Sequence, residues 1–137
     1  MLVVDANLLV VLVSGDPRRT LALRQISDWL DDHIELHAPF LAQYEIANAL
    51  TRLIVTGSFP ADKIEEAANS ILILPIRYHP IANVPRVIEV AKILGRQSAY
   101  DAAYVELAET LNAELWTLDG PLYRNAVGHG FNVRLIE

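Results

Sequence analysis

The stretch MLVVD, residues 1–5, decides the fold class, because it is a short apolar run of β-branched character that ends in an acid. Such a run is typical of a strand buried on both faces of a parallel sheet. A second stretch, ELWTLD at residues 114–119, lies near the other end of the chain and also ends in an aspartate. Two predicted strands that finish in a carboxylate therefore lie at opposite ends of the sequence.

Strands and amphipathic helices alternate along the chain between and around these two stretches. Further strands are expected at residues 34–39, 73–79 and 131–137, and helices at 20–32, 40–57, 60–72, 82–97, 99–113 and 120–130. This alternation implies right-handed crossovers and a mostly parallel sheet with helices on both sides. We therefore predict an α/β fold, in one domain that spans residues 1–137.

Two of the predicted helices carry an apolar stripe that we expect to face the core. In helix 40–57 the spacing places Leu41, Tyr44, Ala47 and Leu50 on one side. In helix 82–97 the corresponding stripe is Val84, Val87, Ile88, Ala91 and Leu94.

The composition indicates a soluble, cytoplasmic protein with some apolar surface left for a partner to cover. Hydrophobic residues make up 53% of the chain, and the mean hydropathy is +0.26. No apolar run reaches the ~18 residues that a membrane span needs, and Asp5 and Asn7 interrupt the opening run. The chain has no cysteine, which excludes disulfides and thiolate metal sites. A net charge of −6 disfavours a broad basic surface for nucleic acid.

Four of the 17 acidic residues fall where a polar surface alone does not explain them. Asp5 and Asp119 end two predicted strands, and ligands of parallel sheets bind beyond the carboxyl ends of the strands. Asp101 begins a predicted helix and so points to the same edge. Glu45 lies within another helix, among neighbours that make a free surface charge less expected. We expect these four acids to meet.

Each of these acids, taken singly, also has an ordinary explanation. Asp5 and Asp119 suit a helix cap or the start of a turn. Asp101 suits the first turn of a helix, where the dipole favours a negative charge, and Glu45 suits a solvated position. Taken together they would repel, at roughly 4 kcal/mol per pair at ~4 Å and an effective dielectric of ~20. A group of four therefore calls for a cation, and oxygen ligands select Mg²⁺ or Mn²⁺, which suits phosphodiester hydrolysis.

Four sequence elements together resemble the PIN-domain family, and within it the VapC-like toxins of toxin–antitoxin pairs. They are VVDANLLV at residues 3–10, YEIANAL at 44–50, SAYDAAYVELAE at 98–109 and LWTLDGPLYRNA at 115–126. The resemblance implies a three-layer α/β/α fold and a Mg²⁺- or Mn²⁺-dependent endoribonuclease. It also implies a homodimer and a cognate antitoxin protein as partner.

The resemblance assigns roles to particular residues. Its acidic positions correspond to Asp5, Glu45, Asp101 and Asp119, and the small polar positions of its first and last motifs to Asn7 and Thr117. Ser98 precedes the third motif, and we assign these three polar residues to supporting hydrogen bonds. Our hypothesis is that Asp5 and Asp101 bind the ion most directly. Asp119 completes that shell, and Glu45 holds a bound water or a second ion.

Basic residues near these motifs are candidates for binding RNA. Arg96 and Arg124 flank the third and fourth motifs, and Arg18 or Arg19 could join them at the phosphates. The four histidines, His33, His37, His79 and His129, have no close ligand spacing, and we interpret them as strand, loop or turn residues. Helices 40–57 and 60–72 are the segments expected to offer a groove to a partner helix.

Other functions stay open on the sequence alone. A housekeeping PIN nuclease in RNA processing would carry the same acids, and a non-catalytic interaction domain would keep the fold without needing them. A phosphate-transfer enzyme with Asp5 as nucleophile usually has a second aspartate two residues later, where this chain has Asn7. Nucleotide binding is disfavoured because the chain has neither a GxGxxG nor a GxxxxGK[ST] loop.

Overall fold

The computed structural model describes all residues, 1–137, and consists of one five-stranded sheet and the helices around it. The strands are β1 (Leu2–Val4), β2 (Leu36–Pro39), β3 (Ile76–His79), β4 (Glu114–Thr117) and β5 (Val133–Leu135). The helices are α1 (Ala6–Val10), α2 (Arg19–Asp31), α3 (Leu41–Val55), α4 (Ile64–Leu72), α5 (Val84–Ile93), α6 (Tyr100–Leu111) and α7 (Gly120–Gly128), with a 3₁₀ turn at Ala61–Lys63.

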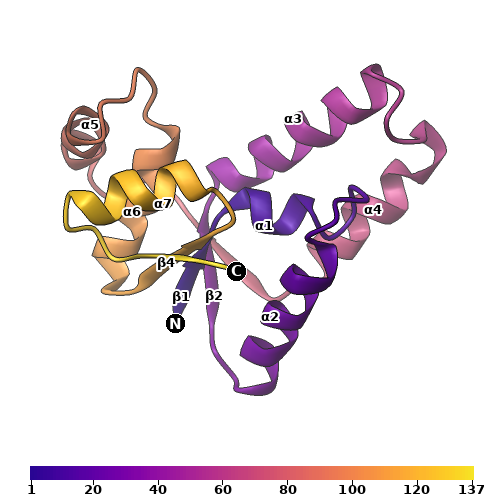
Figure 1. Ribbon diagram of the computed structural model, residues 1–137, viewed down its shortest axis with the longest axis horizontal. Helices are drawn as coiled ribbons and strands as arrows, with labels where there is room; N and C mark the ends of the chain where they lie inside the picture. The colour runs from indigo at the N-terminus through magenta and orange to yellow at the C-terminus, as the bar shows by residue number, and fades with distance from the viewer.

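The sheet is parallel throughout, in the order β3-β2-β1-β4-β5. Figure 1 shows α1 to α4 on one side of the sheet and α5 to α7 on the other. The connections from β1 to β2 and from β2 to β3 run toward one edge of the sheet, and those from β3 to β4 and from β4 to β5 run toward the other. Because all of these crossovers are right-handed, the two sets of helices lie on opposite faces. The predicted α/β class with helices on both faces is confirmed.

The short helix α1 is the element that the sequence pattern left unassigned. It starts directly after β1, with Asp5 as its N-cap, and it packs against α3. Its apolar residues Leu8 and Leu9 are fully buried, which explains the continuous apolar run beyond the first strand. Because α1 begins at once, the end of β1 and the start of a helix coincide at Asp5.

The predicted stripe on α3 is wrong in part. Tyr44 is 74% exposed, and the buried residues of the helix are Ala42, Ile46 and Leu50. Both sets recur at helical spacing, so the sequence alone does not choose between them. The choice is made by α1 and β2, against which α3 packs.

The stripe on α5 is also only partly buried. Val87, Ala91 and Leu94 lie in the core as expected, but Val84 and Ile88 are about half exposed. The helix packs against α6, and that neighbour covers only one side of it. An apolar strip is thus left on the surface.

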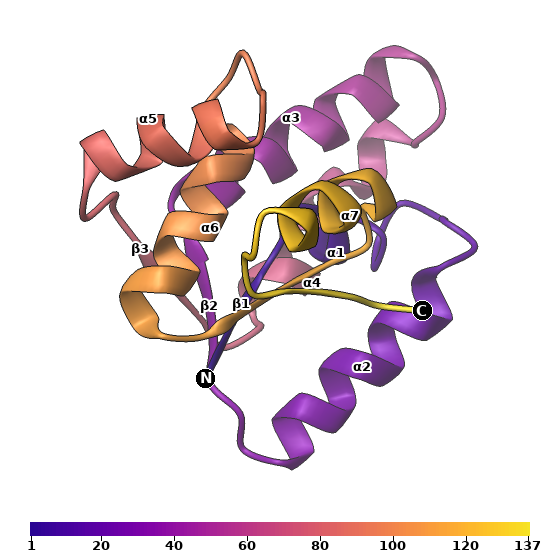
Figure 2. The ribbon, with the colours of Figure 1, turned by 60° about the vertical axis from the view of Figure 1, so that its left-hand side comes forward.

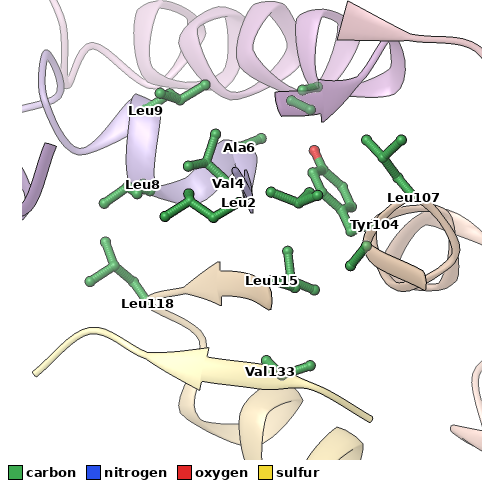
Figure 3. Packing of buried hydrophobic residues seen from close by; sticks show 14 of the residues in the cluster. Leu2, Val4, Ala6, Leu8, Leu9, Tyr104, Leu107, Leu115, Leu118 and Val133 are labelled. Atoms are coloured by element: carbon green, nitrogen blue, oxygen red, sulfur yellow. The ribbon is translucent and has the colours of Figure 1, made fainter. Parts of the chain in front are cut away.

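One cluster of 32 buried residues connects the sheet to both helical layers. Figure 3 shows Leu115 and Val133 of the sheet, Leu8 of α1 and Tyr104 of α6 within this cluster. Tyr104 is its largest fully buried side chain, and its hydroxyl places a polar atom within this apolar cluster. No helix of the chain has the length and apolar character that crossing a membrane requires.

Candidate active site

A cavity of about 590 Å³ lies at the carboxyl ends of β1 and β4. Asp5, Glu45, Asp101 and Asp119 all line it. They come from the end of β1, the first half of α3, the first turn of α6 and the end of β4. The crossovers of the parallel sheet thus bring four acids from distant parts of the chain to one cavity.

Asp5 is held by a small network of hydrogen bonds centred on Thr117. The Thr117 hydroxyl donates to Asp5 Oδ2 at 2.8 Å, and the Asp5 amide donates to the Trp116 carbonyl at 3.0 Å. Asn7 donates through Nδ2 to the Thr117 hydroxyl at 3.2 Å and accepts at Oδ1 from the Leu118 amide at 3.3 Å. Asn7 and Thr117 therefore fix the carboxylate at the end of β1 to the end of β4.

The same hydroxyl also orients Asp119. The Asp119 amide donates to Thr117 Oγ1 at 3.0 Å, and the Leu122 amide donates to Asp119 Oδ1 at 3.0 Å as the N-cap bond of α7. Both Asp5 and Asp119 are thus helix caps, and both also line the cavity. The ordinary capping role and a place in the site are not alternatives here.

Glu45 is fixed by a tyrosine that the sequence analysis did not assign to the site. The Tyr104 hydroxyl donates to Glu45 Oε1 at 2.6 Å, and Figure 3 shows that hydroxyl pointing away from the α6 backbone. Burial raises the pKa of Glu45, the Tyr104 hydrogen bond opposes that rise, and the charge of Asp101 adds to it. The available signal was the spacing, since Tyr104 follows Asp101 by three residues and shares its side of the helix.

Asp101 has a basic neighbour. Arg96 Nε lies 3.7 Å from Asp101 Oδ2, in a partly exposed ion pair. Burial raises the pKa of Asp101, Arg96 lowers it and the charge of Asp119 raises it. Arg96, expected to contact substrate, therefore lies beside an acid of the site.

Asp5 carries the strongest electrostatic perturbation among the four acids. Only 9% of the residue is exposed, and burial raises its pKa from 3.8 to about 7, against the opposing hydrogen bond from Thr117. The charges of Glu45 and Asp101 contribute to the same rise. The carboxylates thus disfavour one another's ionisation, as expected for like charges that share one cavity.

Some predicted residues lie apart from this network, and some unpredicted ones line the cavity. Ser98 is exposed in the loop before α6 and takes part in none of these hydrogen bonds. The Arg124 guanidinium lies over Gly120, outside the cavity lining. Arg18 and Arg52 do line the cavity, and Arg18 forms a two-point contact with Asp16, with both distances 3.0 Å. Arg52 was missed because its position within α3 gives no sequence signal.

The residues fit a divalent cation by their chemistry. All four are carboxylates, the oxygen ligands that Mg²⁺ and Mn²⁺ prefer, and three of them have raised pKa values that a cation would offset. They do not close on one point: no three histidine, cysteine, aspartate or glutamate side chains in the chain are arranged to hold a metal ion as they stand. Mg²⁺ usually keeps several of its waters, so carboxylates spread around a cavity suit it better than a closed cage.

The parallel α/β sheet, with acids at the carboxyl ends of its strands, is the arrangement expected from the resemblance to the PIN-domain family. The model of the PIN domain family matches residues 2–128, and the chain belongs to that family.

Known members of the VapC group are similar to the chain over most of its length. Ribonuclease VapC9 of Mycobacterium tuberculosis is 34% identical over 121 residues, which cover 87% of this chain and 86% of that protein. Ribonuclease VapC3 of Pyrobaculum aerophilum is 34% identical over 126 residues, covering 88% and 91%. The family resemblance expected from the four sequence elements is confirmed, and the chain is VapC-like.

Solved structures share the fold at lower sequence identity. VapBC2 from Rickettsia felis, bound to a DNA fragment from its promoter, has a TM-score of 0.70 at 10% identity, covering 98% of each chain. A toxin–antitoxin complex from Klebsiella pneumoniae has a TM-score of 0.69 at 16% identity, covering 100% of this chain and 98% of the other. At such identities the likeness establishes the three-layer architecture.

Proposed function

We propose that this protein is a metal-dependent endoribonuclease, and that it is the toxin of a toxin–antitoxin pair. The observation that carries the proposal is the single cavity lined by Asp5, Glu45, Asp101 and Asp119. The named ribonucleases that share 34% of its residues support the reaction class. The proposal treats residues 1–137 as one PIN-like domain that acts in the cytoplasm.

Asp5, Asp101 and Asp119 are the residues that would hold Mg²⁺ or Mn²⁺, with Glu45 holding a water or a second ion. When bound, the ion lowers the pKa of a coordinated water and offsets charge on the phosphate. Thr117 and Asn7 keep Asp5 in place, and Tyr104 does the same for Glu45. These supporting bonds matter because a site loose by about 1 Å loses much of its rate.

The arginines around the cavity supply the contacts to RNA phosphates in this proposal. Arg18 and Arg52 line the cavity itself, and Arg96 pairs with Asp101 at 3.7 Å. Arg124 is exposed on α7 and serves phosphates further along the strand. A few local cations are enough to position a backbone, which reconciles RNA binding with a net charge of −6.

The test is cleavage of end-labelled structured RNAs by the purified protein in Mn²⁺, in Mg²⁺ and in a chelator. We expect cleavage only with metal, and a loss of at least about 100-fold for Asp5→Asn and Asp101→Asn. Asp28→Asn, an exposed acid on α2, is the matched control and should cleave normally. Cleavage in the chelator, or full activity of both site variants, would reject the nuclease assignment.

The toxin role is supported by an apolar groove of about 320 Å³ between α3 and α4. Ile46, Leu50 and Ile54 line one side, and Ile64 and Ile71 line the other. Apolar residues at helical spacing on both walls suit the apolar face of a partner helix, which we assign to the antitoxin. Expression of the protein should arrest growth, and Asp5→Asn should relieve the arrest. Arrest by Asp5→Asn as well would contradict this role.

A homodimer is supported by the strip of apolar surface on and before α5. Ile81, Val84 and Ile88 are each about half exposed there. Burying such a strip against a second copy would remove apolar area from water. Light scattering should give a dimer mass for the protein and a monomer mass for Ile88→Lys, while Ile73→Lys, at another exposed isoleucine, should stay dimeric.

A further inference from the structure

A second groove, of about 440 Å³, lies beside the acidic cavity on the outer side of α3. Its walls include Tyr44, Asn48 and Thr51 of α3 and Tyr100 of α6, and Glu45 lines both this groove and the cavity. The two hollows therefore occupy adjacent faces of one helix and share one acidic residue.

Two large aromatic side chains are left exposed in this groove. Tyr44 is 74% exposed and Tyr100 is 58% exposed, although aromatic rings usually bury most of their surface. Each directly precedes an acid of the site, Glu45 in one case and Asp101 in the other.

The position of Tyr100 relative to α3 is set by the core. Tyr104, one turn further along α6, donates its hydroxyl to Glu45 at 2.6 Å, which joins the two helices at this level. Figure 2 shows α6 and α3 adjacent at this end of α6. The two exposed tyrosines are therefore carried on rigid elements next to the carboxylates.

The chemistry of the groove suits a nucleobase and does not suit a phosphate. No lysine or arginine lines it, and its one charged residue is the acid Glu45. Aromatic rings stack on the faces of unpaired bases, and this contact strengthens binding of single strands. Asn48 adds a donor and an acceptor for a base edge, and the Thr51 hydroxyl, which donates to the Ala47 carbonyl at 2.7 Å, can still accept. Arg18 and Arg52 line the acidic cavity instead, and Arg96 pairs with Asp101 at 3.7 Å.

We propose that Tyr44 and Tyr100 form a subsite that binds one unpaired base of the substrate next to the phosphate being cleaved. This inference rests on the proposed nuclease function and adds to it two residues that would contact the substrate beside the cleaved phosphate. A base within a duplex has both faces covered by its neighbours, so the subsite selects single-stranded segments or loops. Because stacking accepts every base, selection acts on strandedness more than on base identity.

The test compares the wild type with Tyr44→Ala, Tyr100→Ala and the two Tyr→Phe variants. In Mn²⁺, on a single-stranded RNA, each Ala variant should raise KM about 5- to 50-fold with kcat nearly unchanged, and Phe should restore most of the loss. An RNA with one abasic position at the subsite should bind the wild type as weakly as the Ala variants. Val55→Ala, also exposed on α3 but outside the groove, is the control.

A binding measurement separates failure of this subsite from failure of the nuclease assignment. Asp101→Asn protein, without and with each Ala substitution, is titrated in a chelator against a single-stranded RNA carrying fluorescent 2-aminopurine. If the RNA fluorescence is quenched on binding, and Tyr44→Ala or Tyr100→Ala abolishes this quenching, the subsite is supported even if the wild type cleaves nothing. Equal binding by all variants overturns it, and so does conversion of a dimer to monomers by either Ala change, which would assign the groove to a second copy.

Discussion

Asp5→Asn is predicted to stabilise the metal-free protein at neutral pH while removing its activity. The Asp5 pKa rises from 3.8 to about 7 because the carboxyl is buried, so the fold favours the protonated form. An acid with a raised pKa contributes its full stability below the unfolded pKa and loses it as the pH rises through the folded pKa. The stability therefore falls between about pH 4 and pH 7, where the unfolded chain has lost the Asp5 proton and the folded chain still holds it.

The size of the effect follows from the shift. A change from 3.8 to about 7 is about three units, and at about 1.4 kcal/mol per unit the cost at pH 8 approaches 4 kcal/mol. Asparagine is close to the neutral carboxyl in shape and still accepts the Thr117 hydrogen bond. The variant should match the wild type near pH 4 and exceed it by about 2–4 kcal/mol at pH 8.

Urea unfolding followed by circular dichroism at several pH values, in a chelator, measures the difference directly. Asp28→Asn serves as the control, because that exposed acid should change stability by less than about 0.5 kcal/mol at any pH. Adding Mn²⁺ should stabilise the wild type and leave Asp5→Asn almost unchanged. A variant advantage that is constant with pH, or absent at pH 8, would refute the reasoning.

Three further substitutions test the supports of the site and the core. Tyr104→Phe removes the hydrogen bond to Glu45 at 2.6 Å, so the Glu45 pKa, measured by NMR titration, should rise further and the protein should lose about 1 kcal/mol; an unchanged titration would exclude that role. Thr117→Val leaves Asp5 and the Asp119 amide without their shared partner, and urea unfolding should show a loss of about 1–3 kcal/mol. Leu115→Ala, at a fully buried position of β4, should cost about 2–5 kcal/mol with the RNA cleavage sites unchanged.

The sequence by itself determined the layers of the fold and the elements that carry the acids. MLVVD and ELWTLD each show a short strand-like run that ends in an acid, and the helices between them show the helical period. Both signals are local. The parallel order of the sheet then follows from crossover handedness, which is also a general rule. From these two facts alone, Asp5 and Asp119 were expected at one edge, where the structure has them.

Only the tertiary structure decided which side of α3 faces the core and what holds the acids. Ala42, Ile46 and Leu50 are buried in place of the stripe with Tyr44, because α1 and β2 cover that side of α3. Tyr104 meets Glu45 across 59 positions of sequence, and Thr117 meets Asp5 across 112. Contacts between residues so far apart in the sequence depend on how the layers pack. The local spacing of apolar residues does not predict them.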